Sequence, residues 1–349
     1  MKKDTIQTRK MQYDLLRSIA CIMVVMLHVS AFYWTKLSPE SPEWRALNFY
    51  DSLTRSSVPL FFMISGVFML SKEQTIKRLY RKNILHLIIV FLIWSVLYAV
   101  DAIGIPAFFQ SDWNKILTFV INGKYHLWFL PTMISVYIVI PILHPLVDYC
   151  NGKYLWYFVG AFFVFGVVKA TLLLYPYSNT SIFTLLVDKI PDFRFYTGYF
   201  VLGYLLANKF EKQINNLFLV LSASFIFLGS TYIGRLDAIA KQVPAGLFYG
   251  YFCLPVCLEA ICLFLLLKNS EDLLAKTTCL NRGILFFSRK TMGIYLLHPF
   301  VLERLDRIGI NSLTWNSWIT VPIVTGITVL ICLVISAVLS QIPLVRKCL

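Results

Sequence analysis

The sequence predicts an all-α fold, a polytopic integral membrane helical bundle of about ten transmembrane helices with cytoplasmic N- and C-termini. Of the 349 residues, 58% are hydrophobic and only 14% are charged, whereas soluble domains are about a quarter charged. Apolar stretches of membrane-spanning length recur from Tyr13 almost to the C-terminus. They leave no polar block for a separate soluble domain, so we expect a single membrane-embedded domain over residues 1–349 and no fused periplasmic domain.

The formal net charge of +14 fits this interpretation. With a cytoplasmic N-terminus, lysine and arginine are more numerous in the inner segments, as cytoplasmic loops require. Anionic lipid headgroups attract such loops, and no basic and aromatic motif for RNA or DNA is visible. We therefore expect a lipid bilayer, and no nucleic acid, as partner. The eight cysteines lie in or beside apolar segments, and their spacing predicts neither a disulfide framework nor a metal site.

The first two predicted helices differ in character. The helix at 13–34 follows a short basic cytoplasmic N-terminus, residues 1–12, and lacks a small-residue cleavage signature, so we expect it to stay as a signal anchor. The helix at 49–70 is apolar only from 58 to 70, and lipid does not tolerate its polar outer half. Either it starts late, or its polar end lines a cavity open to the outside. Pro59, together with Ser65 and Gly66, allows a bend or close packing in this helix.

The remaining helices follow from apolar runs of roughly twenty residues. The third follows the basic loop SKEQTIKRLYRKN, the fourth begins near HLWFL, and the ninth contains a His-Pro pair. The fifth contains Lys169, which we expect to extend to the membrane surface. The eighth contains Glu259, at a depth where it can pair with a charge of the first helix. The predicted ranges are 83–101, 125–144, 153–175, 193–208, 215–234, 245–267, 284–302 and 317–342.

Arg17 and His28 lie eleven residues apart on the first helix. A rise of about 1.5 Å per residue separates them by roughly 16 Å, with Arg17 near the inner interface and His28 in the outer part of the membrane. Ionisable residues inside a membrane are functional candidates. In the structural alternative, Arg17 extends to lipid phosphates and His28 hydrogen-bonds a neighbouring helix. Asp14 and Glu259 are the possible charge partners of Arg17.

Two other histidines, His126 and His298, share the predicted outer half of the membrane with His28. There, one histidine can act as a general base near neutral pH and another can orient a substrate. Structural alternatives stand for both. His126 can be an interfacial anchor beside Trp128, and His298 can precede a simple kink at Pro299.

The loop after the second helix carries Arg78 and Arg81, three residues apart. If this segment is helical, the spacing places both guanidinium groups on one face, where they can clamp phosphates. Cytoplasmic loops are rich in such charges, so a purely topological role is the alternative.

Six motifs occur in order between about residues 11 and 345: Arg-x10-His in the first helix, VPLFFMISGVFML, Arg-x-x-Arg, HLWFL, GYFVLGYLLAN and SRKTMGIYLLHPFV. Together they resemble the acyltransferase-3 family of membrane acyltransferases. The resemblance implies an enzyme of the bacterial inner membrane that transfers an acyl group, usually acetyl from cytoplasmic acetyl-CoA, to a hydroxyl of a surface glycan or its undecaprenyl-linked precursor. It also implies that Arg17 and His28 are essential and that Arg78 and Arg81 handle acyl-CoA. Acetyl-CoA is then a substrate, and no bound cofactor is expected.

Under this resemblance, His28 removes the proton from the glycan hydroxyl as it attacks the thioester carbonyl. A neighbouring group must stabilise the oxyanion, and His126, Trp128 and Ser65 are the candidates. His298 is a further possible contact to the oxyanion or the acceptor. A covalent acetyl-His28 intermediate is the lesser variant.

Two other classes of function compete with acyl transfer. An exporter of glycan intermediates or acyl groups fits ten helices and intramembrane charges, although the internal repeats frequent in transporters are not visible. A structural scaffold has only the bulk composition in its favour. Dependence on an acyl-CoA donor separates the enzyme from the exporter.

Overall fold

The computed structural model describes residues 10–174, 182–271, 274, 278–343 and 345–347, so most of the predicted basic N-terminus, 1–12, lies outside it. Within these residues the regular structure is entirely helical, and seven segments are long and apolar enough to cross a membrane. The chain is therefore a polytopic helical membrane protein. The seven segments are Met11–Trp34, Pro42–Leu70, Ile76–Ile103, Phe129–Leu146, Tyr149–Leu172, Asn216–Lys241 and Ser317–Leu339.

Three further predicted membrane segments form shorter helices, namely α13 (Tyr196–Asn208), α15 (Leu254–Lys268) and α18 (Thr291–Arg307). Their side chains are mostly buried or half-buried in the protein. A helix surrounded by other helices does not have to cover the full ~30 Å of hydrocarbon by itself. Hydropathy therefore predicted the positions of these three helices, although each is shorter than a helix that crosses the membrane in contact with lipid.

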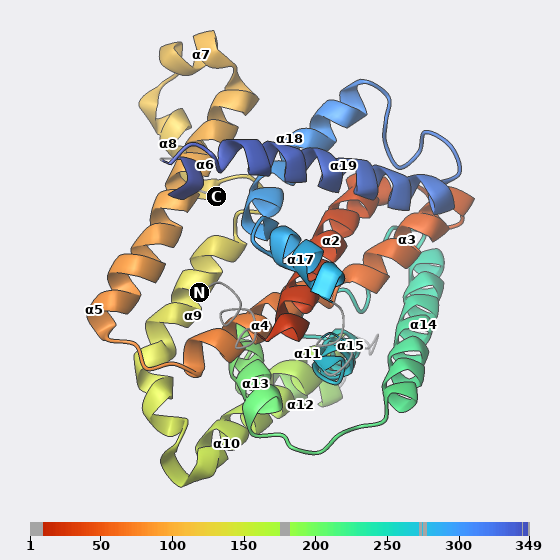
Figure 1. Cartoon of the computed structure of the whole chain (residues 1–349). Coiled ribbons are helices and arrows are strands. Elements are labelled where there is room, and N and C mark those ends of the chain that lie inside the picture. The colour runs from red at the N-terminus through yellow and green to blue at the C-terminus, as the bar shows by residue number, and fades with distance from the viewer. Residues whose placement is uncertain (1–9, 175–181, 272–273, 275–277, 344, 348–349) are drawn as a thin grey trace.

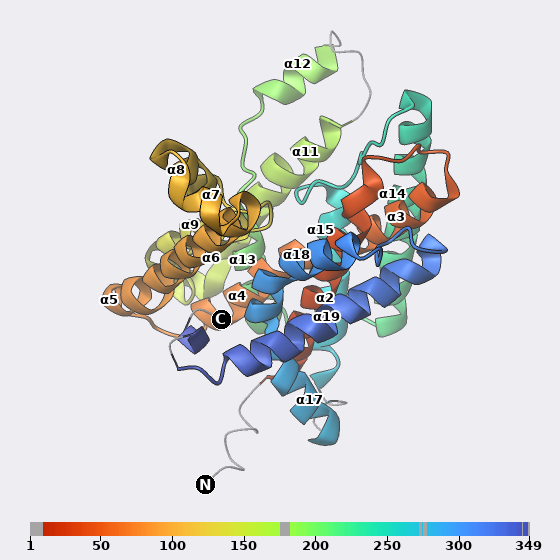
Figure 2. The same ribbon diagram turned by 90° about the horizontal axis from the view of Figure 1, so that it is seen from above.

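Helix α2 (Met11–Trp34) lies in the middle of the bundle, and its two halves serve different cores (Figures 1 and 2). Tyr13, Leu16 and Ala20 join one cluster of buried apolar residues, whereas Cys21 and Val25 join a second. This helix thus connects the two clusters, which places its side chains between them. Its helical neighbours are α3 (Pro42–Thr54), α4 (Ser57–Leu70), α15, α17 (Thr278–Ser288), α18 and α19 (Ser317–Leu339).

Helices α4 and α13 cross at glycines. A Cβ atom on Gly66 would lie 1.8 Å from the Phe200 carbonyl oxygen, and one on Gly203 would lie 2.2 Å from the Met63 carbonyl oxygen. Only glycine permits this approach of the two backbones, as at small-residue crossings of membrane helices. The close packing predicted at Gly66 is confirmed.

The apolar part of the second predicted helix starts late, at Ser57, as one of the two alternatives expected, but the polar residues before it form a separate helix. Helix α3 begins at Pro42, earlier than predicted, and meets α4 at Arg55 and Ser56. Asp51 and Ser52 are buried in protein rather than lining an open cavity. Arg55 donates to the Asp51 carboxylate (Nε to Oδ2, 3.0 Å), and Ser52 shares a 2.7 Å hydrogen bond with Thr231. Protein partners thus replace the water that lipid cannot supply.

Several predicted helices are interrupted where the site forms. The predicted 284–302 segment breaks between α17 and α18, and the predicted 245–267 segment is irregular before α15 begins at Leu254. Helix α9 starts at Phe129, so His126 lies in the preceding loop instead of beginning the helix. The other helices are α6 (Leu85–Ile103), α7 (Ile105–Gln110), α8 (Trp113–Asn122), α10 (Lys153–Ala161), α11 (Lys169–Leu172), α12 (Ile182–Lys189) and α14 (Asn216–Lys241).

Lys169 does not extend to the surface as expected. Its side chain is buried, and its Nζ donates to the Ile190 carbonyl oxygen at 2.5 Å. A backbone acceptor within the protein therefore compensates this charge, so the expectation of surface exposure was wrong.

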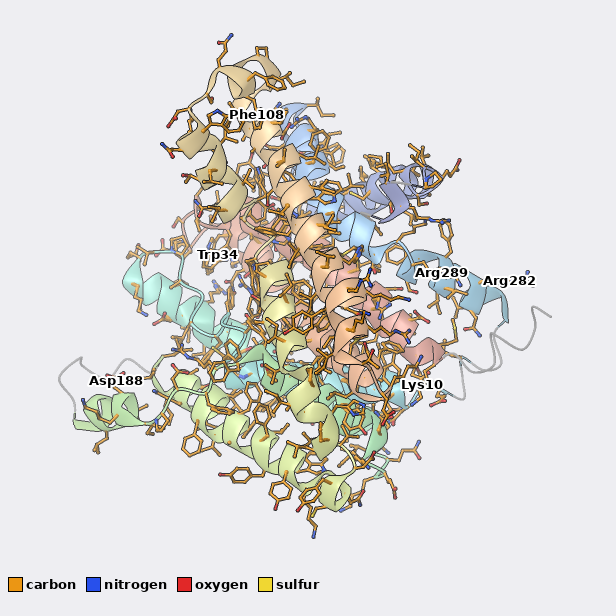
Figure 3. All side chains as sticks on the ribbon, turned by 90° about the vertical axis from the view of Figure 1, so that its left-hand side faces the viewer. Lys10, Trp34, Phe108, Asp188, Arg282 and Arg289 are labelled. Carbon is orange, nitrogen blue, oxygen red and sulfur yellow. The ribbon has the colours of Figure 1, made fainter. Side chains whose placement is uncertain are left out.

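The two ends of α2 lie toward opposite sides of the molecule. Figure 3 places Lys10 on the same side as Arg282 and Arg289, and Trp34 on the other side with Asp188. The predicted topology assigns the first three residues to the inner face and the last two to the outer face.

Candidate active site

A cavity of about 350 Å³ follows α2 between the two apolar clusters. Arg17 lines it near the amino end of the helix and His28 near the carboxyl end. Eleven residues are close to three complete helical turns, so both side chains lie on one face of α2. Of the other predicted site residues, Ser65 on α4 and the loop residues His126 and Trp128 also line the cavity. Further lining residues are Phe61, Met133, Tyr137, Tyr251, Arg289 and Tyr295.

Arg17 also lines a second cavity, of about 540 Å³, at the amino end of α2. The guanidinium carbon lies 5.3 Å from the centre of the Phe68 ring, within cation–π range. The exposed side chains of Lys10 and Lys72 supply further positive charge to this second cavity, and Asn208 supplies a polar amide. Arg17 thus stands where a basic vestibule meets the inner cavity.

Three histidines from distant parts of the chain meet at the carboxyl end of α2. His28 Nδ1 lies 2.9 Å from His298 Nε2. The His126 and His298 ring centres are 5.3 Å apart. His126 and His298 are buried, whereas His28 is half-buried and lines the cavity. The structure therefore brings together the three histidines that the predicted depths assigned to one half of the membrane.

The His126 ring is tightly packed, and both of its nitrogens are buried. It makes edge-on contacts with Tyr98 and Tyr295, at ring-centre distances of 5.3 and 5.2 Å. The Tyr295 hydroxyl donates to the His126 carbonyl oxygen at 2.6 Å, which holds the loop to α18. Neither ring nitrogen of His126 has a well-aligned hydrogen-bond partner within the described part of the chain, although the Leu296 backbone lies near the ring. A buried polar group without a partner is costly, so a ligand oxygen that reached either nitrogen would offset this cost.

Trp128 and Ser65 are less buried than His126, since Trp128 is 36% exposed and Ser65 is half-buried. The Trp128 ring stacks on Tyr251, with ring centres 5.8 Å apart and an interplanar angle of 27°. The Ser65 hydroxyl lies close to the Tyr137 hydroxyl, and both residues line the cavity. Both residues shape the wall of the cavity, and both are more exposed than His126.

Asp14 organises the break between α17 and α18. The Ser288 hydroxyl donates to Asp14 Oδ1 at 2.7 Å, and the next residue, Arg289, lines the cavity beside Arg17. Arg289 was not among the predicted site residues. Its position in SRKTMGIYLLHPFV, nine residues before His298, was the available signal.

Four predicted residues do not line either of the two cavities described above. They are His298, which contacts His28, and Glu259, Arg78 and Arg81. Glu259 is buried on α15, which packs on α2, and its pairing with Arg17 stays a prediction. Arg78 ends the short helix α5 (Ile76–Arg78), and Arg81 lies in the π-helical turn Leu79–Ile84. Both arginines are exposed. The three-residue spacing of Arg78 and Arg81 therefore does not place both guanidinium groups on one face as it would in an α-helix, because a π-helix has a different number of residues per turn.

Comparison with known proteins supports the resemblance. The acyltransferase domain of the acyltransferase-3 family matches residues 12–337. A serine/alanine racemase from Enterococcus gallinarum is 26% identical over 263 residues, which are 68% of this chain and 36% of the relative. The chain thus spans about a third of the length of that curated relative. No solved structure matches the chain significantly. Because the family match covers nearly the whole chain, the protein belongs to the acyltransferase-3 family, whose membership implies enzymatic acyl transfer.

Proposed function

We propose that this protein is a membrane-bound O-acyltransferase of the bacterial inner membrane, which moves an acetyl group from cytoplasmic acetyl-CoA to a hydroxyl of a surface glycan or its undecaprenyl-linked precursor. The observation that carries the proposal is the cavity that joins Arg17 to the histidine cluster at His28. Its length along α2, roughly 16 Å, suits an extended thioester arm that reaches from one side of the membrane into the other half.

The vestibule at the amino end of α2 receives the donor. Lys10, Arg17 and Lys72 bind phosphate oxygens of coenzyme A through charge-assisted hydrogen bonds. Arg78 and Arg81 lie shortly after Lys72 in the chain, where they add contacts to the exposed part of the nucleotide. The apolar walls beyond Arg17 then accommodate the pantetheine arm and direct the thioester toward His28.

His28 acts as the general base. Its ring takes the proton from the acceptor hydroxyl as the hydroxyl oxygen bonds to the thioester carbonyl carbon. The carbonyl oxygen becomes negatively charged, and an N–H of His126 donates to it. When the carbon–sulfur bond breaks, the leaving thiolate receives the proton from His28, and the products are the acetyl ester and free coenzyme A. Acetylation of His28 itself, followed by transfer to the acceptor, is the lesser variant.

The acceptor is proposed from the family resemblance rather than from the cavity. Within the family, the sequence is similar to the O-acetyltransferase of enterobacterial common antigen, so a glycan of that class is the first acceptor to test. The half of the bundle that contains His28 corresponds to the predicted outer face, where such glycans are exposed after assembly.

An exporter of glycan intermediates or acyl groups is the competing function. It would also need a path across the membrane, and the two cavities that meet at Arg17 provide one. An exporter has no need of a thioester, however, and it leaves no ester on the glycan.

Mass spectrometry of surface glycans separates these functions. We compare cells that lack the gene with cells complemented by wild type or by His28→Ala. Loss of the acetyl mass increment on deletion, with restoration only by wild type, supports the proposal. Unchanged acetylation with altered amounts of glycan at the surface would instead indicate export.

A further inference from the structure

Helix α18 contains a carbonyl that the helix cannot use. An α-helical carbonyl normally accepts from the N–H group four residues later. Pro299 stands four residues after Tyr295 and has no N–H. In the structure, His298 Nδ1 lies 2.7 Å from the Tyr295 carbonyl oxygen. The ring of His298 therefore takes the place of the backbone donor that proline removes.

This contact fixes where His298 carries its proton. A carbonyl oxygen only accepts, so Nδ1 of His298 is the donor. A neutral imidazole has one N–H, which leaves a lone pair on His298 Nε2. That atom lies 2.9 Å from His28 Nδ1, so His28 Nδ1 carries the hydrogen between the two rings. His28 Nε2 is then the nitrogen with a free lone pair.

Burial supports the division of roles between the two rings. His298 is fully buried and is not among the residues that line the cavity, whereas His28 lines it. The ring of His28 thus meets substrate, and the ring of His298 contacts only protein. Such a contact determines which nitrogen of a catalytic histidine is protonated. The choice matters for catalysis, because a His28 ring with Nε2–H would present a donor where the reaction needs an acceptor.

We infer that His298 is a positioning residue that holds His28 as the Nδ1–H tautomer, with Pro299 freeing the Tyr295 carbonyl that orients His298. The assignment rests on the proposed function only in its consequence for acyl transfer, since the tautomer itself is a property of the resting protein. It differs from the role of an oxyanion or acceptor contact, because His298 acts through His28.

Two variants of similar shape test the role of His298. The side-chain oxygen of His298→Gln can accept from His28 Nδ1, whereas His298→Met has only a weak acceptor. The protein is reconstituted in liposomes with ¹⁵N-labelled histidine, and the signals of His28 are identified by their loss in His28→Ala. We expect the proton on Nδ1 of His28 in wild type and His298→Gln, and on Nε2 in His298→Met. A proton on Nε2 in wild type, or on Nδ1 in His298→Met, would overturn the inference.

Acetyl transfer provides the second readout. His298→Met should lower kcat by about 100-fold or more, within the range of general-base catalysis, with the KM for acetyl-CoA unchanged. His298→Gln should recover most of this loss. Equal kcat values for the two variants would reduce His298 to a packing residue. If wild type transfers no acetyl group, the proposed function fails, and the ¹⁵N spectrum still decides the tautomer.

Discussion

Arg17 and His28 line opposite ends of one cavity from the same face of α2. The spacing of the Arg-x10-His motif has a direct physical meaning here, since eleven residues return the chain to the same face after about three turns. A spacing of nine or thirteen residues would rotate one side chain by roughly half a turn or more out of the cavity. The motif therefore encodes both the reach of the cavity and the common direction of the two groups.

Substitution of His28 by alanine should lower acetyl transfer by about 10²- to 10⁴-fold, because the acceptor hydroxyl loses its general base. Membrane insertion and protein amount should stay at wild-type levels, since His28 is only half-buried and faces a cavity. The assay follows radiolabelled acetyl from acetyl-CoA into glycan in reconstituted liposomes. His86→Ala is the matched control, because His86 lies outside the cavity. Full activity of His28→Ala would remove this histidine from the mechanism.

The basic vestibule should govern donor affinity. Lys72→Ala should weaken acetyl-CoA binding by roughly tenfold, which corresponds to one charge-assisted hydrogen bond. Arg78→Ala combined with Arg81→Ala should also weaken it, and both effects should shrink at high salt because the side chains are exposed.

Isothermal titration of the detergent-solubilised protein with acetyl-CoA measures these affinities. Arg282→Ala serves as control, because Arg282 is an exposed cation that Figure 3 places on the same side as Lys10. An unchanged affinity in the Arg78 and Arg81 double variant would assign those two arginines to membrane topology alone.

His126→Phe should separate activity from stability. The phenylalanine ring keeps the aromatic contacts with Tyr98 and Tyr295. It removes the nitrogens that we propose to contact the oxyanion. We expect kcat to fall by about 10²-fold, as when one oxyanion donor is removed, with little change in KM. Because neither ring nitrogen has a well-aligned partner within the described residues, thermal stability should hold or rise. A loss of stability together with wild-type kcat would make His126 a structural anchor.

The sequence predicted the parts of the fold that depend on transfer into lipid. Hydropathy located α2, α14 and α19, and depth counted along the predicted helices grouped His28 with His126 and His298. Hydropathy did not predict the break between α17 and α18 that brings Arg289 to the cavity, because the chain changes direction there inside the protein. Transfer into lipid distinguishes apolar from polar residues, but it carries no information about contacts between buried elements.

The same limit explains the polar half of the second predicted helix. Asp51 and Arg55 look incompatible with a membrane helix when each residue is judged against lipid. Their mutual ion pair, together with the contact of Arg55 with the Tyr249 carbonyl oxygen (Nη1 to O, 3.4 Å), makes the segment acceptable inside the protein. Such compensation depends on α3 and on the irregular residues before α15, which come together only in the folded chain.

Removal of one partner of this buried ion pair should destabilise the fold far more than removal of one partner of an exposed pair of the same spacing. Asp51 is 0% exposed, so Arg55→Ala would leave an uncompensated buried carboxylate, at a cost of about 3–5 kcal/mol. The Lys241–Asp237 pair on α14 also joins residues four positions apart, but its lysine is 49% exposed. Lys241→Ala should therefore change the free energy of unfolding by at most about 0.5 kcal/mol.

Thermal unfolding in detergent compares these variants, and a double variant shows the cause of the loss. Asp51→Asn combined with Arg55→Met removes both charges, so it should be more stable than Arg55→Ala alone, even though it lacks the same ion pair. If the double variant is the less stable of the two, the loss comes from the missing contacts of Arg55 with Tyr249 rather than from the unpaired carboxylate. In that case the guanidinium stabilises the fold chiefly by holding the segment before α15, whose Tyr251 forms part of the cavity wall.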